Sequence, residues 1–405
     1  MKKIIVVGGG AAGLMAAYAA ASTGKQVILL EKNEKLGKKI YITGKGRCNL
    51  TNDCSPDDFL NNLVRGAKFM TRTAYVFPPS KTMGFFESNG LPLKVERGNR
   101  VFPVSDHASD VTKTLERACR NAGVQICLET CVTGLKVFDG AVCGVLTDEG
   151  ERPCDAVIIA TGGLSYPSTG STGDGYRFAL AAGHTVVPTV PSLVGIELAE
   201  NGSAAQGISV KNAVLSAKCK GKHIFSQMGE LLFTHYGISG PLVLSLSALI
   251  NRLDLSDVRL ALDFKPALDE KAMEDRLLRD FSARKNEQMK NVMRGFLPAG
   301  LTQVVLRAAK VSAEKQANAV TREERRRLLF ALKGLSLTPT ALRGYAEAVI
   351  TSGGVDTKEI NPATMESRRV KGLYFCGEVL DCDAFTGGFN LQIAFSTGYV
   401  AGINA

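Results

Sequence analysis

Three glycines near the N-terminus have the spacing that a dinucleotide pyrophosphate requires. Gly8, Gly10 and Gly13 form G-x-G-x-x-G in "VVGGGAAGLMAA", between a β-branched segment at 4–7 and a small-residue segment at 11–22. In such a turn the first glycine makes the tight bend, the second lets the backbone approach the phosphates, and the third lets helix and strand pack closely. The start of the following helix offers free N–H groups and partial positive charge to the phosphates.

An acidic residue follows the second predicted strand. Glu31 comes directly after residues 27–30, at the distance from Gly8 that is typical of this motif. A carboxylate there accepts hydrogen bonds from ribose hydroxyls and repels a 2′-phosphate. The motif, its flanking strands and Glu31 therefore predict a bound dinucleotide, but they do not separate FAD from NAD.

The other end of the chain decides between the two. "LYFCGEVLD" predicts a buried strand that ends in Gly377 and Glu378, and "GGFNLQIAFSTGYVAG" predicts a glycine-rich turn that opens an apolar helix. An acidic residue at a strand end can hold ribityl hydroxyls. The helix N-terminus at 389–392 can direct its dipole at the flavin N1 and C2 carbonyl, where negative charge accumulates on reduction. An NAD enzyme does not need this distant second half, so we expect FAD to bind here and to carry the chemistry.

The elements that position these residues follow the strand–turn–helix–strand order of a Rossmann-like α/β domain. "CDAVIIATGG" at 154–163 predicts another buried strand, broken by a Gly pair. We expect residues 1–188 and 342–405 to form the two parts of the FAD-binding domain. Short alternating segments at 189–263 predict a β-rich inserted domain, and the pattern at 264–341 predicts a helical inserted domain.

The chain is moderately basic, with a formal net charge of +10. Lys and Arg outnumber Asp and Glu by sixteen to ten between residues 263 and 341. We interpret this excess as the solvated face of a helical domain rather than as a nucleic-acid surface, because no aromatic residues interleave with the charges in base-stacking fashion.

Composition also favours a cytoplasmic protein. The ten cysteines are scattered and form no C-x-x-C pair, which favours reduced thiols and argues against a metal site. The apolar start is split by glycines and leads at once into a second strand, so it is not interpreted as a signal peptide. No segment approaches the length of about 20 apolar residues that spans a bilayer, so no membrane partner is expected.

The motifs together resemble a bacterial family of FAD-dependent oxidoreductases. The resemblance extends from Ile4 to Gly402 and is carried by "TGKGRCNLTN", "ATGGLSYPSTGSTGDGY", "FTHYGISGP", "VITSGGV" and "GLYFCGEVLDCDAFTGGFNLQIAFSTG". That family includes aminoacetone-oxidase-like proteins and the bile-acid-operon flavoprotein, a 3-dehydro-bile acid Δ4,6-reductase. It implies a split FAD domain of the glutathione reductase/fumarate reductase type with a β-rich and a helical insertion.

The resemblance also implies which residues line the cofactor. These are Gly8, Gly10, Ala12, Gly13, Glu31, Lys32, Lys38, Arg47, Cys48, Asn49, Val132, Thr161, Gly162, Glu378, Gly388, Asn390 and Leu391. Val132 would meet the adenine through its backbone, and Cys48 is interpreted as a spacer beside the ligand rather than as an activated thiolate. The pair Ala384 and Phe385 departs from the smaller or more flexible pair of many relatives, which leaves the fit of a substrate near the flavin ring open.

The sequence excludes one large class of flavoenzymes. A second G-x-G-x-x-G and a redox C-x-x-C are both missing, so the pyridine-nucleotide disulfide reductases do not fit. We expect NADH or NADPH to reduce the flavin transiently, hydride to leave N5 for a conjugated C=C bond, and a protein acid to protonate the neighbouring carbon. The candidate acids are His235, in "FTHYGISGP", and Tyr166, which follows the second Gly pair.

Three functions remain open at this point. The favoured one is an NAD(P)H-driven reductase of a flat, apolar carbonyl substrate that can carry an anionic group, such as a 3-dehydro-Δ4/Δ6 bile acid. The second is an FAD-dependent oxidase that takes hydride from an amine such as aminoacetone and passes electrons to O2, giving H2O2. The third is a non-catalytic flavoprotein that binds nucleic acid through the basic helical domain.

Overall fold

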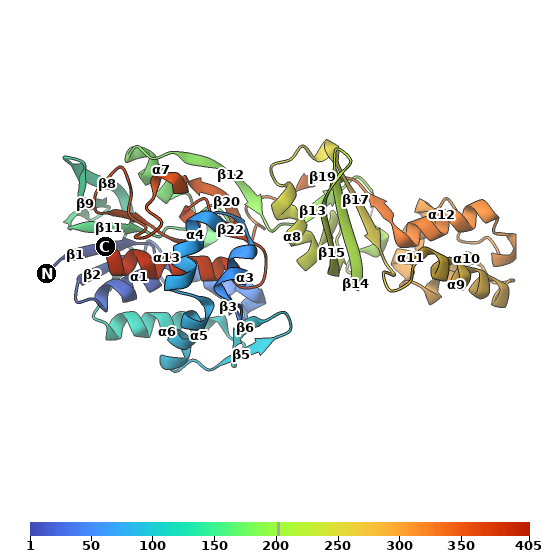
Figure 1. The fold of residues 1–405 in the computed structure, drawn as a ribbon, viewed down its shortest axis with the longest axis horizontal. Coiled ribbons are helices and arrows are strands. Elements are labelled where there is room, and N and C mark those ends of the chain that lie inside the picture. The colour runs from blue at the N-terminus through green and yellow to red at the C-terminus, as the bar shows by residue number, and fades with distance from the viewer. Residues whose placement is uncertain (201–202) are drawn as a thin grey trace. The chain divides into compact units, whose positions relative to one another are not determined.

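The computed structural model describes residues 1–200 and 203–405, which form two compact units. The first unit contains Met1–Ser192 and Tyr345–Ala405, so both ends of the chain contribute to it. The second unit contains Leu193–Gly344. Figure 1 shows blue N-terminal and red C-terminal elements together in the first unit. Each unit has its own apolar core.

A five-stranded parallel sheet forms the centre of the first unit, in the order β21-β11-β1-β2-β7. Its strands are β1 (Lys3–Val7), β2 (Gln26–Leu30), β7 (Gln125–Cys127), β11 (Ala156–Ile159) and β21 (Leu373–Phe375). The strands KIIVV, QVILL and AVII are runs of branched apolar residues, which suit a parallel sheet that is buried on both faces. Since β21 pairs with β11, the C-terminal segment completes the sheet that the N-terminal segment begins.

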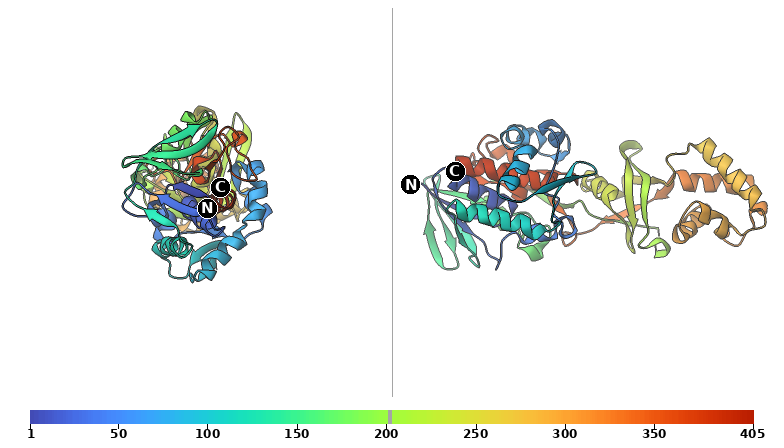
Figure 2. Two further views of the ribbon diagram at one scale, coloured as in Figure 1. Left: turned by 90° about the vertical axis from the view of Figure 1, so that its left-hand side faces the viewer. Right: turned by 90° about the horizontal axis from the view of Figure 1, so that it is seen from below.

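Two helices from opposite ends of the chain pack against each other in this unit. They are α1 (Ala11–Ala21) and α13 (Phe389–Asn404), and both views that show them place the red helix beside the blue one (Figures 1 and 2). A Cβ on Gly398 would lie 2.4 Å from the carbonyl oxygen of Ala12, and a Cβ on Gly402 would lie 2.3 Å from that of Ala16. The glycines therefore let the two backbones touch. Because residue numbers rise together along both helices, α1 and α13 run parallel.

The remaining elements of the first unit build small sheets and surface helices. The helices are α2 (Lys38–Ile42), α3 (Pro56–Asn61), α4 (Ala67–Val76), α5 (Pro79–Ser88), α6 (Ala108–Asn121) and α7 (Asp174–Ala181). The strands are β3 (Thr51–Asn52), β4 (Leu63–Arg65), β5 (Leu93–Glu96), β6 (Arg100–Pro103), β8 (Val132–Phe138), β9 (Ala141–Thr147), β10 (Gly150–Pro153), β12 (Val186–Ser192), β20 (Ile350–Val355) and β22 (Asp383–Ala384). β12 ends at the last residue before the second unit and pairs antiparallel with β20.

The second unit combines an antiparallel sheet with helices. The sheet has the order β18-β17-β14-β15-β16-β13-β19. Its strands are β13 (Ile196–Leu198), β14 (Ser209–Cys219), β15 (Lys222–Phe233), β16 (Gly237–Ser239), β17 (Val258–Asp263), β18 (Leu335–Leu337) and β19 (Pro339–Leu342). The helices are α8 (Pro241–Ile250), α9 (Glu270–Ala283), α10 (Met289–Val292), α11 (Ala299–Ala308) and α12 (Arg322–Lys333). Strands and helices share one core, to which Leu262, Met273 and Leu332 all belong.

Several features that would indicate other chemistry are missing from the described residues. In the part of the chain that the structure describes, no helix has the length and apolar character needed to cross a membrane. Within the same ranges, no group of three His, Cys, Asp or Glu side chains could hold a metal ion. The ten cysteines are all free thiols.

Candidate flavin site

The glycine turn between β1 and α1 is shaped by steric limits that differ from one glycine to the next. Gly8 has φ +104°, and a Cβ there would lie 2.6 Å from the carbonyl oxygen of Ala160. A Cβ on Gly13 would lie 1.8 Å from the carbonyl oxygen of Gly8. A Cβ on Gly10, in contrast, would meet nothing within 4 Å. Gly8 and Gly13 are thus required by the fold itself, whereas Gly10 borders open space that a ligand can enter.

Glu31 braces this turn from the end of β2. Its side chain is 7% exposed, and Oε2 accepts a hydrogen bond from the backbone N–H of Gly9 at 2.7 Å. Oε1 accepts from the backbone and side-chain nitrogens of Asn33, at 2.8 and 2.6 Å. A carboxylate has about four lone-pair sites, so Glu31 keeps capacity for a hydroxyl donor. The backbone N–H of Thr130 donates to the Glu31 carbonyl at 3.0 Å, which brings the buried Val132 close to the same edge of the sheet.

The two lysines expected to line the cofactor are held by acidic side chains of the protein. Lys32 Nζ lies 2.6 Å from the Asp174 carboxylate of α7. Lys38 Nζ lies 2.7 Å from Glu34, and it donates to Asn33 Oδ1 at 3.2 Å. Both lysines therefore lie beside the turn and help to fix the loop that follows β2.

Glu378 joins segments that are far apart in the sequence. Its Oε2 accepts a hydrogen bond from Lys39 Nζ at 2.5 Å. Its Oε1 accepts from the Ser165 hydroxyl and from the backbone N–H of Thr351, the latter at 2.8 Å. The Thr351 hydroxyl in turn accepts from the backbone N–H groups of Leu164 and Ser165, at 2.8 and 3.0 Å. The carboxylate thus fixes the relative positions of α2, β20 and the loop after β11.

The turn before α13 is built like the turn before α1. Gly387 and Gly388 have φ values of +130° and +96°, and a Cβ on Gly388 would lie 2.3 Å from the carbonyl oxygen of Thr51. Asn390 fixes the turn from inside: its side chain donates to the Ala384 carbonyl and accepts from the Ala384 N–H, both at 2.9 Å. No side chain among the described residues caps α1 or α13, and the first turn of each helix lacks acidic residues. Both N-termini are therefore free to meet an anionic group.

The loop at 47–49 contributes one paired cation, one inert thiol and one unpaired oxygen. Arg47 Nε donates to Asp106 Oδ1 at 2.8 Å, and the guanidinium carbon lies 4.3 Å from the ring centroid of Phe102. Burial raises the pKa of the Cys48 thiol to about 12, so this environment favours the neutral thiol over the thiolate. Asn49 Oδ1 is buried and has no hydrogen-bond partner in the described parts of the chain, and the same is true of Thr161 Oγ1 at the end of β11.

The two candidate acids lie in different units. Tyr166 belongs to the first unit, where its backbone N–H donates to the Tyr345 carbonyl at 2.9 Å. Burial, together with the Glu347 carboxylate, raises the pKa of the Tyr166 hydroxyl above its usual range. His235 is exposed in the second unit and packs edge-on against Tyr236, with ring centroids 5.1 Å apart.

The structure also shows residues near the candidate site that the sequence motifs did not indicate. Lys39, Ser165 and Thr351 all bond to Glu378, and Lys39 also donates to the Ser165 hydroxyl at 2.5 Å, but nothing in their local sequence marks this meeting. Asp383 is fully buried and accepts from the Ser352 hydroxyl at 3.1 Å. Burial raises the pKa of the Asp383 carboxyl to about 6. Its place in "LDCDAFTGG", directly before the turn that opens α13, was the available signal.

Comparison with known proteins places this site in a family. The model of the family described as "HI0933-like protein Rossmann domain" matches residues 2–404. A 3-dehydro-bile acid delta(4,6)-reductase of Clostridium scindens is 34% identical over 389 residues, which cover 95% of this chain and 94% of that protein. A ribosomal RNA dihydrouridine synthase of Haemophilus influenzae is 31% identical over 391 residues, which cover 95% of this chain and 93% of that protein.

The fold has relatives among solved structures. The open conformation of a flavocytochrome c3 fumarate reductase has a TM-score of 0.54 and 18% sequence identity, covering 100% of this chain and 78% of that one. The predicted α/β class, a Rossmann-like domain of the fumarate reductase type with additional sheets and helices, is confirmed. The resemblance predicted from the sequence motifs is confirmed as well.

Proposed function

The chain belongs to the HI0933-like Rossmann family, and on that premise we propose that it is an FAD-dependent oxidoreductase that reduces a C=C bond conjugated to a carbonyl group. The names of the two relatives support this reaction class. One reduces double bonds of a 3-dehydro bile acid, and the other makes dihydrouridine, in which the ring double bond next to a carbonyl is saturated. The two substrates differ greatly in shape but share a conjugated carbonyl.

The register of α1 against α13 carries the proposal. Gly398, which contacts Ala12, is nine positions after Phe389, the first residue of α13. Ala12 is only one position after the first residue of α1. Because the helices run parallel, their free N-termini point the same way and are offset by about 12 Å, at about 1.5 Å per residue. This offset is of the same order as the ribityl chain that separates the pyrophosphate of FAD from its ring system.

The residues at the two ends fit the two ends of FAD. The turn at Gly8 and Gly10 would hold the pyrophosphate, and Glu31 would accept from the adenosine ribose. The unpaired oxygens of Asn49 and Thr161 provide acceptors that have no other partner in the described ranges. The N-terminus of α13 would face the part of the ring where negative charge develops. When FAD is bound, it supplies hydride transfer at ring nitrogen N5.

We propose NADH or NADPH as the transient hydride donor and Tyr166 or His235 as the proton donor. A tyrosine hydroxyl is protonated at neutral pH, and burial of Tyr166 raises its pKa further, so it is present in the form that can donate a proton to a carbon or an enolate oxygen. The first candidate substrate is a flat, apolar carbonyl compound such as a 3-dehydro-Δ4/Δ6 bile acid, in line with the C. scindens relative.

A second candidate substrate is a uridine within RNA. The observation that favours it is the excess of sixteen Lys and Arg over ten Asp and Glu between residues 263 and 341, together with the name of the H. influenzae relative. The reaction at the flavin would be the same for both candidates, since each substrate presents a C=C bond conjugated to a carbonyl.

The experiment that tests this function follows the flavin absorbance without oxygen. Purified protein is mixed with NADH or NADPH, and the reduced protein is then mixed with a 3-oxo-Δ4 steroid or with an unmodified ribosomal RNA transcript. We expect one nucleotide to bleach the flavin and one of the two acceptors to restore its colour. Bleaching by aminoacetone instead, with H2O2 formed in air, would identify an amine oxidase and contradict the proposal.

A further inference from the structure

One side of α12 is exposed and carries arginines beside an aromatic ring. Arg322, Arg326 and Phe330 follow at intervals of four residues, so they lie on the same side of the helix. Phe330 is 47% exposed, and the guanidinium carbon of Arg326 lies 5.4 Å from the centroid of its ring. The side of α12 that carries Leu328 and Leu332 is buried and belongs to the core of the second unit.

Further cations adjoin this side of the helix. Arg327 Nε donates to the carbonyl oxygen of Ala309 at 2.7 Å, so α12 touches the end of α11. Arg307 lies in the last turn of α11, and Lys310 follows that helix. We call the set Arg307, Lys310, Arg322, Arg326, Arg327 and Phe330 the α12 face. Its five cations are all exposed, and across residues 1–200 and 203–405 none of them forms an ion pair.

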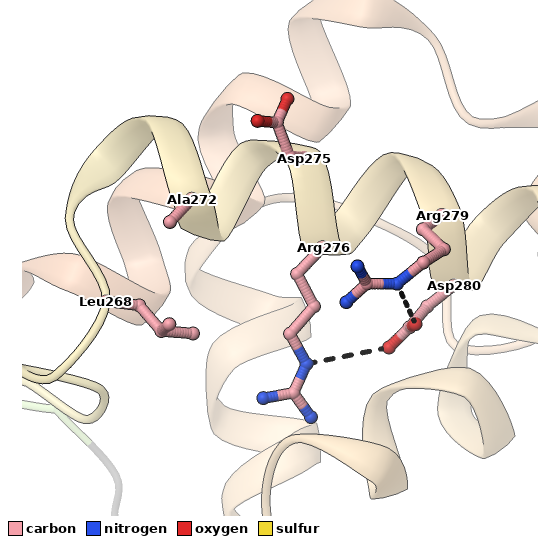
Figure 3. Close-up of a pocket in the computed structure, with 6 residues that line it drawn as sticks. All are labelled: Leu268, Ala272, Asp275, Arg276, Arg279 and Asp280. Carbon is pink, nitrogen blue, oxygen red and sulfur yellow. Dashed lines mark ion pairs between the residues drawn. The ribbon is translucent and has the colours of Figure 1, made fainter.

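Two arginines on α9 of the same unit do have an acidic partner, which they share. An open hollow of about 650 Å³ lies along α9. Arg276 and Arg279, which line it, both reach Asp280, at 3.8 and 3.9 Å, and Figure 3 marks these two ion pairs with dashed lines. Arg276 also stacks on Phe296, with 4.7 Å between the guanidinium carbon and the ring centroid. The α12 face differs because its cations form no ion pair among the described residues and because an exposed aromatic ring lies beside them, which leaves it available to an external polyanion.

Glu323 and Glu324 are the two acids of α12 itself, and the pKa of Glu324 is lowered chiefly by its hydrogen bonds with Lys315 and in part by the charge of Arg327. Glu324 accepts hydrogen bonds from Lys315 Nζ at 2.7 and 2.8 Å and from the backbone N–H of Thr321, so it forms part of the N-terminal cap of the helix. Lys333, at the other end of α12, lies 2.6 Å from Asp263. Glu323 is the exposed acid that remains next to Arg322.

We propose that the α12 face is a docking surface for folded RNA. Arginine binds phosphate through two parallel N–H donors, and successive cations on one side of a helix are spaced by about 6 Å. An exposed aromatic ring among arginines offers a stacking surface to an unpaired base, which neither a lipid headgroup nor an acidic peptide requires. The proposal rests on the proposed function, since RNA would carry the uracil ring whose double bond is reduced.

The test compares two pairs of exposed cations that have the same spacing on different helices. Arg322→Ala/Arg326→Ala removes two cations from the α12 face. Lys68→Ala/Arg72→Ala removes two exposed cations, also four residues apart, from α4 in the first unit. Binding of a fluorescent, unmodified ribosomal RNA transcript is measured as a function of salt, with vesicles of anionic lipid as a second probe. Circular dichroism and thermal unfolding establish that each variant is folded.

We expect the α12 variant to bind the transcript roughly tenfold more weakly, with the slope of log affinity against log salt reduced by about 2. The α4 variant should match the unchanged protein. Phe330→Ala should weaken binding and leave the salt slope unchanged, because stacking releases no counterions. Equal affinity and slope in the α12 and α4 variants would overturn the docking surface. So would tighter binding to vesicles than to RNA.

A separate readout distinguishes this proposal from the proposed function. Anaerobic bleaching of the flavin by NADH or NADPH is measured in all variants, and it should be unchanged in the α12 variant. Loss of RNA binding with normal bleaching supports the surface. If neither nucleotide bleaches the flavin of the unchanged protein, the proposed function fails, whatever the RNA measurements show.

Discussion

Lys39 Nζ donates a hydrogen bond to Glu378 Oε2 at 2.5 Å, although the two residues are 339 positions apart in the sequence. The pair connects α2, which follows the glycine turn, with the strand end that precedes α13. The Lys39 and Glu378 side chains are 22% and 11% exposed, so the pair is largely withdrawn from solvent. It holds the N-terminal and C-terminal parts of the candidate flavin site in one arrangement.

Replacing Glu378 by Gln should therefore loosen the site. The variant leaves the Lys39 ammonium without its carboxylate, and a partly buried group that loses its partner costs about 1–3 kcal/mol. We expect a lower midpoint of thermal unfolding and faster loss of FAD on gel filtration. Lys136→Gln is the control, because Lys136 pairs with Glu151 on the surface, where the side chains are 48% and 44% exposed and such pairs contribute about 0–1 kcal/mol. Equal behaviour of the two variants would contradict this role of Glu378.

Two alanine substitutions in the glycine turn should separate folding from cofactor binding. Gly13→Ala places a Cβ against the Gly8 carbonyl and should lower the free energy of unfolding by about 1–3 kcal/mol, even without FAD. Gly10→Ala meets no protein atom within 4 Å, so the apoprotein should keep its stability while FAD content falls. Thermal unfolding of the apoproteins and the FAD content of the purified variants are the measurements. Full FAD occupancy in Gly10→Ala would show that the pyrophosphate does not approach this position.

The two candidate proton donors can be told apart by measuring separately the reduction of the flavin by NAD(P)H and its reoxidation by the substrate. If Tyr166 donates the proton, Tyr166→Phe should slow reoxidation of the reduced flavin by the C=C substrate by about 10²–10⁴, the usual size of general acid catalysis. Reduction by NAD(P)H should be unchanged. Tyr75→Phe is the control, since Tyr75 is 55% exposed and donates to Asp57. A large effect of His235→Ala with none of Tyr166→Phe would transfer the role to His235.

Acid should destabilise the first unit through His184 and Glu359. The buried His184 contacts Glu359 at 3.1 Å and the Ser367 hydroxyl at 2.7 Å. Burial lowers the pKa of His184 below 6.5, while hydrogen bonds from Arg369 and Thr185 lower the pKa of Glu359 from 4.5 to about 2. Both groups bind protons more readily in the unfolded chain, so their contribution is complete above pH 6.5 and is lost as the pH falls towards 2.

Denaturant unfolding at several pH values tests this expectation. The free energy of unfolding should decline below pH 6.5, first through His184 and then, below pH 4.5, through Glu359. His184→Gln should flatten the first part of the decline. An unchanged pH profile in the variant would contradict the assignment to His184.

The parts of the fold that were predictable from the sequence are those with local causes. The spacing of Gly8, Gly10 and Gly13 and the branched runs around them specify a strand, a turn and a helix within one segment. The partnership of Lys39 with Glu378 has no local signal, because it depends on how β21 adds to the sheet beside β11. Contacts of this kind arise from the complete fold and are found only in three dimensions.

The α12 face is a second feature that could not be predicted from the sequence. The sequence records how many arginines the helical segment contains, but not which of them meet a carboxylate. Arg276 and Arg279 reach Asp280, whereas Arg322 and Arg326, which are equally charged, reach no acid in the described ranges. Counting charges along the chain therefore favoured a solvated face, and the pairing pattern was needed to single out one surface.

The most direct test of the central claim is an anaerobic two-step mixing experiment that follows the flavin absorbance. Protein is first mixed with NADH or NADPH and then with a compound that contains a C=C bond conjugated to a carbonyl, either a 3-oxo-Δ4 steroid or a uridine-containing ribosomal RNA transcript. We expect bleaching in the first step, and reoxidation in the second step with one saturated product molecule per flavin. A flavin that stays oxidised with both nucleotides, but is bleached by aminoacetone, would contradict the proposed reductase function.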